Sequence, residues 1–284
     1  MDRLSEQEDI TVVCSALGIP RSSYYAYRSR NNVIDHSRAA LRAKVERVFT
    51  LSRHSAGSRT VCSVLLDKGI KVGRYKVRSL MHEASLVSKQ PGKHAYRQAR
   101  KEHADVPNRL DRKFDVSQPN QVWCGDITYI WVARRWHYLA AVLDLCRRRV
   151  VGWAMSSHAN AELTIKALDM AYQHRGQPSD VLFHSDQGLQ YASQLFKQQL
   201  DCYGMRQSMS RRGNCWDNAP MERLLRSLKS EWIPESGYDS DAEARRDISY
   251  YLMYHYNYWR PHQYNVGLTP AKAEKEPNLL SRIT

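Results

Sequence analysis

The amino-acid sequence predicts an α/β protein in which a mixed β-sheet, flanked by helices, follows an N-terminal helical region. Residues 121–156 hold three runs of aromatic and β-branched residues that are typical of strands. Residues 160–260 then alternate amphipathic helices with two short strands, which favours a central sheet covered by helices. Residues 10–86 instead show the apolar spacing of several short helices.

Two short helices are predicted at the start of the chain, within a segment that we place at residues 1–34. The first, ITVVCSALGI, ends near Gly18, and Pro20 prevents it from continuing. The second, YYAYRSR, carries basic residues. Two short helices separated by Gly and Pro residues are typical of a helix–turn–helix, although this pattern also arises in many other helical proteins.

A second helical unit, residues 35–87, is predicted to bind DNA. Its three helices are expected in SRAALRAKVERVFTLS, SRTVCSVLLDKG and VGRYKVRSLMHEASL. The third helix carries Arg74, Lys76 and Arg78, which are candidate DNA contacts because such a helix commonly enters the groove. The alternative is a small helical bundle whose Lys and Arg side chains are only solvated.

Positive charge is concentrated in this part of the chain. The sequence has 43 Lys and Arg against 29 Asp and Glu, and residues 51–100 alone hold 11 basic and 2 acidic residues. Such a field favours a polyanionic partner, since neutralising phosphates releases counterions. A merely basic surface, or a ribosomal or membrane-surface partner, is the alternative. Residues 88–117, with few large apolar residues and no periodicity, are predicted to be a basic linker.

Composition excludes several classes of protein. No stretch approaches the roughly 18 apolar residues of a membrane helix. The acidic N-terminus MDRLSEQEDITVV lacks the basic start of a signal peptide. The six cysteines are scattered without CxxC pairs, which argues against a disulfide framework or a zinc site. We therefore expect a cytoplasmic protein with no membrane partner.

The second half of the chain alternates predicted strands and helices. The strands are expected in VWCGDITYIWV, RRWHYLAAVLDL, RRVVGWAMS, VLFHSDQG and, at the sheet edge, MRQSMS. The helices are expected in NAELTIKALDMAYQHRG, SQLFKQQLDCYG, PMERLLRSLKSEWI and DAEARRDISYYLMYHYNYWR. The aromatic spacing of Tyr250–Trp259 favours core packing over base stacking, and Arg260 and His262 beyond it are candidate phosphate contacts.

Three carboxylates stand where chemistry is expected. Asp126 lies inside the first strand, Asp186 ends the strand VLFHSD, and Glu222 lies in the first turn of its helix. The carboxyl ends of strands commonly carry functional groups in open α/β sheets. A buried acid is costly unless it is paired or coordinates a metal, and three acids form an all-oxygen site suited to Mg²⁺ or Mn²⁺. The competing acid, Asp144, is interpreted as a strand-end residue that supports the sheet.

The helix of Glu222 has two different sides. At about 100° per residue, Glu222, Arg226 and Lys229 share one stripe, which places two candidate DNA-binding cations beside a candidate metal ligand. The other side is apolar and comprises Met221, Leu225, Leu228 and Trp232. An i, i+4 Glu–Arg ion pair on a solvated face is the alternative, and on the helix alone it is favoured.

Four segments, in order, resemble the DDE integrase-type transposases of the insertion-sequence-3 family, in their second reading-frame product. The segments are WCGDITYI, HSDQGLQYAS, SMSRRGNCWDNAPMERLLRSLKSE and YNYWRPHQYNVGLTP. There are 59 residues between Asp126 and Asp186, and 35 between Asp186 and Glu222, the second spacing being the family's hallmark. The resemblance covers residues 38–86 and 116–280. It departs from the family where Leu224-Leu225 replaces an often aromatic pair and where Ala56-Gly57 replaces Tyr-Gly.

The resemblance implies a ribonuclease-H-like, integrase-type catalytic domain over residues 118–284, closed by a C-terminal helix. It implies that Asp126, Asp186 and Glu222 hold two Mg²⁺ ions, for which Mn²⁺ is expected to substitute. The implied reaction is metal-dependent DNA cleavage followed by strand transfer of insertion-sequence ends. Such chemistry needs charge neutralisation more than a protein nucleophile, which agrees with the lack of a Ser/His/Asp pattern.

Residues near these acids have candidate roles as well. Arg211 and Arg212 precede Gly213-Asn214, in a loop that is expected to close on DNA. Asn218 is expected to cap the Glu222 helix rather than to steady substrate. His184 is expected to pack beside its strand, with the orientation of a ligand as the alternative.

The implied partners are double-stranded DNA, as terminal repeats and target, and further copies of the chain on that DNA. The resemblance also implies a first-frame product, fused or separate, that supplies end recognition and a coiled coil, which agrees with the lack of sustained heptads in this sequence. Less selective DNA binding by the chain's own helical units is the alternative. The protein is expected in bacterial cytoplasm, at the nucleoid when bound to DNA. Two rivals are a nuclease that cleaves without joining and a DNA-binding regulator without activity. A retroviral-type integrase is disfavoured, since no His-His-Cys-Cys module precedes the core.

Overall fold

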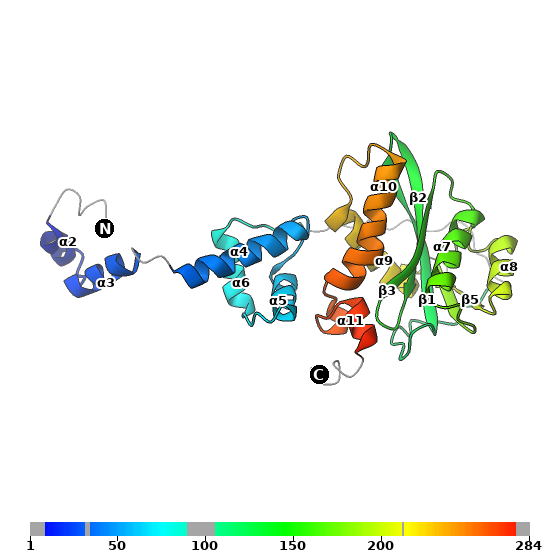
Figure 1. Cartoon of the computed structure of the whole chain (residues 1–284), viewed down its shortest axis with the longest axis horizontal. Helices are drawn as coiled ribbons and strands as arrows, with labels where there is room; N and C mark the ends of the chain where they lie inside the picture. The colour runs from blue at the N-terminus through cyan, green and yellow to red at the C-terminus, as the bar shows by residue number, and fades with distance from the viewer. Residues whose placement is uncertain (1–8, 32–34, 90–105, 212, 277–284) are drawn as a thin grey trace.

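The computed structural model describes residues 9–31, 35–89, 106–211 and 213–276, which are coloured in Figure 1. Arg212 and most of the predicted linker lie outside these residues. In the part that is described, no helix combines the length and the apolar character needed to cross a membrane. Near the start of the chain, the two expected short helices are α2 (Ile10–Ala16) and α3 (Arg21–Asn31).

Three helices form the unit that was expected between residues 35 and 87. They are α4 (His36–Leu51), α5 (Ser58–Asp67) and α6 (Arg74–Glu83). Asp35 caps α4 by accepting a hydrogen bond from the backbone N–H of Arg38 at 2.9 Å, whereas glycines precede the other two helices. Their shared core includes Val45, Val48, Phe49, Val61, Val64, Leu65, Val77, Leu80 and Met81. We refer to this unit as the helical domain.

A five-stranded mixed sheet forms the centre of the second half of the chain. Its strands are β1 (Val122–Val132), β2 (Arg135–Asp144), β3 (Arg149–Ser156), β4 (Leu182–Ser185) and β5 (Arg206–Met209). The order across the sheet is β3-β2-β1-β4-β5. The first three strands pair antiparallel, while β4 and β5 run parallel to β1. The predicted mixed sheet with an edge strand at β5 is therefore confirmed.

Helices cover both faces of the sheet (Figure 1). On one face lie α7 (Ala161–His174) and α8 (Gln194–Cys202), whose apolar residues share a core with Trp123 of β1. On the other lie α9 (Ala219–Ser227) and α10 (Asp241–Ser249), whose core includes the β1 residues Cys124, Ile130 and Val132. Because side chains alternate along a strand, Asp126 points to the same side as Cys124 and Ile130, toward α9.

Both helices of this second layer continue as π-helical turns. The segment Leu228–Trp232 extends α9, and Tyr250–Trp259 extends α10, so each predicted continuous helix changes its winding midway. The buried aromatic face of the second extension includes Tyr251, His255 and Tyr256. Its other face leaves Tyr250, Tyr254 and Tyr258 about half exposed. The expected core packing thus holds for one side of the stripe.

Short elements complete the unit built on this sheet, which we refer to as the sheet domain. A 3₁₀ turn, Cys215–Asn218, leads into α9. A second one, Gln263–Asn265, precedes the C-terminal helix α11 (Pro270–Lys275). The end of the segment predicted as a linker also packs here, because Leu110 and Val116 are buried in the core beneath α9 and α10.

The helical domain is joined to the sheet domain by specific contacts. Arg53 forms a two-pronged ion pair with Asp247 of α10, at 2.5 and 3.0 Å, and stacks 3.9 Å above the ring of Trp232. Trp259 packs against the core of the helical domain. Lys272 of α11 reaches Asp67 of α5 at 2.5 Å. These contacts place α5 beside α11 (Figure 1).

Gly152 of β3 allows α7 to lie unusually close to the sheet. A Cβ atom on this residue would stand 2.3 Å from the carbonyl oxygen of Ala167 and 2.6 Å from the backbone N of Ala171. Both atoms belong to the helix backbone, which cannot step aside as a flexible side chain would. The packing of α7 therefore depends on the missing side chain.

We expect Gly152→Ala to lower the free energy of unfolding by about 1–3 kcal/mol, as overpacking of a tight interface does. Urea or thermal unfolding followed by circular dichroism measures the change. Gly73→Ala is the control, because nothing lies within 4 Å of the added methyl group there. An unfolding midpoint for Gly152→Ala equal to that of the control would show that the close approach is not limiting.

Candidate active site at the carboxyl end of β4

The register of the sheet brings Asp126 and Asp186 together. Gly125 of β1 pairs with Ser185 of β4 in the parallel ladder, and each of the two acids directly follows its paired residue. Asp126 is partly exposed and Asp186 is exposed at the strand end. The backbone N–H of Gly188 donates to the Asp186 carboxylate at 3.0 Å and orients it. The two predicted acids are thus neighbours on adjacent strands.

Asn218 attaches the start of α9 to β1. Its side-chain Nδ2 donates to the carbonyl oxygen of Gly125 at 3.1 Å, and its Oδ1 is buried without a hydrogen-bond partner among the described residues. It makes no capping hydrogen bond to α9, so the expected cap is wrong. The side chain reaches the strand instead of turning back on its own helix. This anchor holds Glu222, one helical turn further on, near the strand that carries Asp126.

The three acids share one electrostatic environment. The pKa of Asp126 lies well above its ordinary range, first because the surrounding protein desolvates the carboxyl of this partly exposed residue and next because Asp186 is negatively charged. The charge of Glu222 raises this pKa further, whereas a 2.7 Å hydrogen bond from the N–H of Ile127 lowers it. Like charges held this close favour a cation between them.

The donor chemistry of these acids fits a hard divalent cation. All three offer carboxylate oxygens, the donors that Mg²⁺ prefers. The mutual repulsion that raises the pKa of Asp126 is what a bound cation would relieve. Among the described residues, no group of three or more His, Cys, Asp or Glu side chains stands close enough to hold a metal ion as placed.

Lys229 supplies positive charge beside the acids. Its Nζ lies 4.0 Å from the centre of the Tyr129 ring, and its charge acts on the carboxyl of Asp126. Burial lowers the pKa of Lys229, while the charge of Asp126 opposes that change. Arg226, one turn earlier on the same helix, is exposed. The apolar side expected for this helix is also confirmed, since Met221, Leu225, Leu228 and Trp232 are buried.

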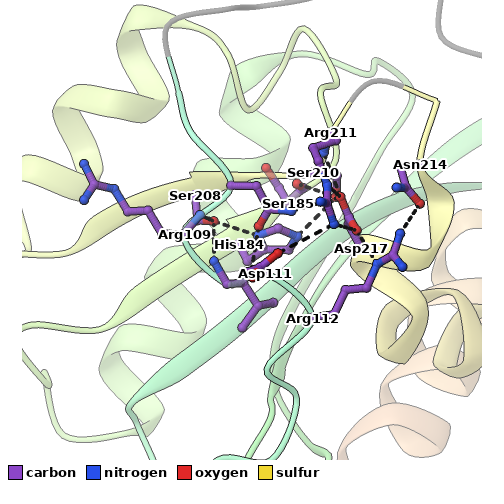
Figure 2. Close-up of polar contacts among 12 residues, drawn as sticks. Arg109, Asp111, Arg112, His184, Ser185, Ser208, Ser210, Arg211, Asn214 and Asp217 are labelled. Carbon is purple, nitrogen blue, oxygen red and sulfur yellow. Dashed lines mark hydrogen bonds and ion pairs between the residues drawn. The ribbon is translucent and has the colours of Figure 1, made fainter.

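A further acid, Asp217, is fully buried and lies at the centre of a polar network (Figure 2). The guanidinium of Arg211 donates to both of its carboxylate oxygens at 3.0 Å, and the backbone N–H of Arg211 adds a third bond. Arg112 donates at 2.7 Å and Asn108 at 2.9 Å from the segment before β1. Burial alone would raise the pKa of Asp217, but these hydrogen bonds outweigh it and hold the pKa well below its usual value.

His184 links β4 to β5 beside this network. Its two ring nitrogens lie within hydrogen-bonding distance of the Ser208 and Ser210 hydroxyls, at 2.9 and 3.1 Å. The Ser210 backbone N–H and hydroxyl both donate to the carbonyl of Ser185, the residue before Asp186. Burial lowers the pKa of His184 to about 4, so the ring is neutral near pH 7. The packing role expected for His184 fits this placement.

The other candidates occupy different places. Arg74, Lys76 and Arg78 are exposed on α6, within the helical domain. Arg211 is bound to Asp217 as described. Arg260, expected to meet phosphate, instead donates to Glu231 at 2.5 and 2.7 Å.

Asp144 has the supporting role expected of it. Its carboxylate is buried, accepts hydrogen bonds from the backbone N–H groups of Asn120 and Cys146, and faces Arg175 at 3.4 Å. It therefore holds the loops at one end of the sheet and lies apart from the three candidate catalytic acids.

Replacing the Asp217 carboxylate with an amide tests the polar network. We expect Asp217→Asn to lower the free energy of unfolding by about 2–3 kcal/mol at pH 7, less than for a fully enclosed ion pair because both arginines are about half exposed. Chemical unfolding at a series of pH values measures it, with the exposed Asp239→Asn as control. The difference should be full above about pH 5 and shrink below about pH 4, since the folded-state pKa is lowered. A difference that is independent of pH would contradict this assignment.

Comparisons with known protein families agree with this architecture. Residues 116–215 match a family model described as an integrase core domain, and residues 203–270 match a second one with the same description. Residues 36–94 match a model described as an HTH-like domain. The integrase matches cover the sheet together with α9, and the HTH-like match covers the helical domain.

Two solved structures are similar to parts of this chain. One is a simian T-cell lymphotropic virus intasome in complex with PP2A regulatory subunit B56 gamma, with a TM-score of 0.47 and 17% identity, covering 83% of this chain and 76% of that one. The other is the HTLV-2 integrase catalytic core domain in complex with magnesium, with a TM-score of 0.41 and 18% identity, covering 55% of this chain and 96% of that one.

Curated relatives are much more similar in sequence. The putative transposase InsO for insertion sequence element IS911B of Escherichia coli K12 is 45% identical over 166 residues, which cover 58% of this chain and 84% of the relative. The transposase InsF for insertion sequence IS3A of the same organism is 34% identical over 271 residues, 94% of both chains. With this identity over almost its whole length, and with both domains matched, the chain belongs to the IS3 family of transposases.

Proposed function

We propose that this transposase cleaves insertion-sequence ends and joins them to target DNA with Asp126, Asp186 and Glu222 as its catalytic, metal-binding acids. The observation that carries the assignment is their convergence. Two of the acids follow paired residues on β1 and β4, and the third lies one turn beyond the Asn218 anchor on β1. The effect of both other acids on the pKa of Asp126 supports a single site.

Two Mg²⁺ ions, or Mn²⁺ in their place, are the proposed cofactors. When bound, such ions activate the attacking oxygen and stabilise the leaving 3′ oxygen of an in-line displacement at phosphorus. The chain contributes the carboxylates, with Ile127 and Gly188 orienting two of them through backbone N–H groups. Lys229 and Arg226, on the stripe of Glu222, are proposed to meet the phosphates next to the scissile bond.

DNA contacts are proposed in two further places. Arg74, Lys76 and Arg78 project from α6 and are suited to the backbone or groove of terminal-repeat DNA. Arg211 lies in the loop before α9, and Arg212, which follows it in the sequence and lies outside the described residues, is proposed as a second contact. Because Asp217 fixes the guanidinium of Arg211, we propose that it orders this loop and gives the DNA a preformed edge. Further copies of the chain, and a first-frame product, are the proposed protein partners.

Strand transfer in vitro tests the proposal, with labelled insertion-sequence ends, target DNA, Mg²⁺ and the full chain. We expect joined product from the wild type and a loss of at least about 100-fold in Glu222→Gln, Asp126→Asn and Asp186→Asn, on the scale of losing one electrostatic stabiliser. Asp201→Asn, exposed on α8, is the matched control and should retain wild-type activity. Binding of the same DNA should persist in all variants.

The rival functions predict different products. Cleaved ends that never become joined, even with the first-frame product added, would favour a nuclease. Equal inactivity of the wild type and the Glu222→Gln variant under those conditions, with DNA still bound, would favour a regulator. Wild-type activity in any of the three acid variants would show that the substituted acid is not a catalytic residue.

A further inference from the structure

A cavity of about 490 Å³ lies at the junction between the helical domain and the sheet domain. The residues that matter here are Arg59, Thr60 and Ser63 from α5, Arg223 and Ser227 from α9, and His262 from the loop before α11. Gly267 closes the junction, since a Cβ there would stand 2.9 Å from the Ser63 hydroxyl. The cavity is thus made by residues that are far apart in sequence and belong to different domains.

Two arginines give this cavity net positive charge. Arg59 and Arg223 are both exposed, and within the ranges that the structure describes neither forms an ion pair with a carboxylate. Arg260 also lines the cavity but is neutralised by Glu231. The hydroxyls of Thr60, Ser63 and Ser227 add hydrogen-bond donors around the two charges. Two uncompensated guanidinium groups with nearby hydroxyls suit a phosphate.

His262 provides an independent indication that an anion belongs here. Only 7% of this residue is exposed, and its Nδ1 is buried with no hydrogen-bond partner among the described residues. Burial, and next the positive charges of Arg260, Arg148 and Arg223, lower the pKa of His262 to about 3. The ring is therefore neutral, and the neighbouring arginines make the electrostatic potential around it positive.

The start of α5 adds to the same preference. Its N-cap residue is Gly57, which offers no side chain to accept from the first-turn N–H groups, and Arg59 and Thr60 lie in that turn. The positive end of a helix dipole favours an anion beside it. This effect reinforces the arginines.

We propose that the junction cavity binds a phosphodiester of the DNA backbone, held between Arg59 of the helical domain and Arg223 of α9. The proposal rests on DNA being the substrate of the proposed function. Arg223 directly follows Glu222, so one turn of α9 faces the acids on one side and the cavity on the other. A phosphate bound there would set the orientation in which DNA bound by the helical domain approaches the proposed catalytic acids.

A polymer backbone fits the cavity better than a small anion. Exposed arginines on both sides of the junction allow a chain to pass across it. The cavity also continues the positive field of residues 51–100, in which phosphate neutralisation releases counterions along a polyanion. A free phosphate would use only the local charges.

The test measures the affinity of the full chain for insertion-sequence-end DNA over a series of salt concentrations. The variants are Arg59→Gln, Arg223→Gln, the double variant and the corresponding double Lys variant. The matched control is Arg246→Gln, an exposed arginine on α10. Each single Gln variant should reduce the slope of log K against log salt by about 1 and the double variant by about 2, because each lost contact releases one counterion fewer. The double Lys variant should recover most of the slope, and the control should match the wild type.

Several outcomes would overturn the proposal. One is a double Gln variant that keeps wild-type affinity and slope while its melting temperature shows that it is folded. Another is a wild-type melting temperature raised by inorganic phosphate at constant ionic strength, together with unchanged DNA binding in the variants, since the cavity would then hold a free anion. Inactive wild-type protein whose DNA binding still depends on Arg59 and Arg223 would sink the proposed function and leave the cavity assignment standing.

Discussion

Gly125 is the residue at which the sheet, the helix layer and the candidate site meet. Its backbone pairs with Ser185 in the parallel ladder and accepts the hydrogen bond from Asn218. A Cβ on this residue would lie 2.6 Å from the Phe183 ring and 3.1 Å from the Tyr191 hydroxyl. Because it has no side chain, β1 can approach those aromatic rings while its carbonyl holds the start of α9. The positions of Asp126, Asp186 and Glu222 all follow from that one strand position.

The buried charge of Asp217 also helps to hold the start of α9 in place. A buried carboxylate is costly unless its oxygens are satisfied, and here Arg112, Asn108 and Arg211 satisfy them. The segment 106–112 is thereby tied to the loop that leads into α9. His184 and its serine partners connect the same region to the end of β4. The polar network therefore limits how far the helix of Glu222 can move relative to the strand of Asp186.

Sequence patterns were sufficient for the fold because the strands and helices have local sequence signatures. A run of aromatic and β-branched residues identified β1, and the apolar side of α9 followed from its helical spacing. The three acids were recognisable because they occupy strand and helix positions at family spacing; their catalytic role stays a prediction. Asn218 was misjudged because its side chain makes a contact with a strand 93 residues away, which no local rule describes.

Ion pairs between residues that are far apart in the sequence could not be predicted from the sequence patterns. Arg211 and Arg260 look alike as basic residues near the site, yet each has its carboxylate partner only in the folded chain. Residues 106–117 have a linker's composition, although two apolar side chains are enough to dock them. The placement of Arg59 and Arg223 around one cavity was equally unpredictable from the sequence, because it arises only where α5 and α9 come together.

In this molecule, the positive charge that favours DNA binding and the acids that are proposed to act on DNA lie in different parts of the chain. In the sheet domain, Arg112, Arg175 and Arg260 are satisfied by buried or partly buried carboxylates. Residues 116–284, which include Arg175 and Arg260, carry a net charge of only +3, against +11 for residues 1–115, which include Arg112.

We therefore propose that most of the attraction for DNA comes from the helical domain, whereas the proposed catalytic acids would repel its phosphates until cations are bound. Arg223 is an exception, since it places an uncompensated cation on the helix of Glu222. A backbone phosphate held there, as proposed above, would offset part of that repulsion before catalysis. The geometry of the junction, as much as the acids themselves, would then decide which phosphodiester reaches the proposed site.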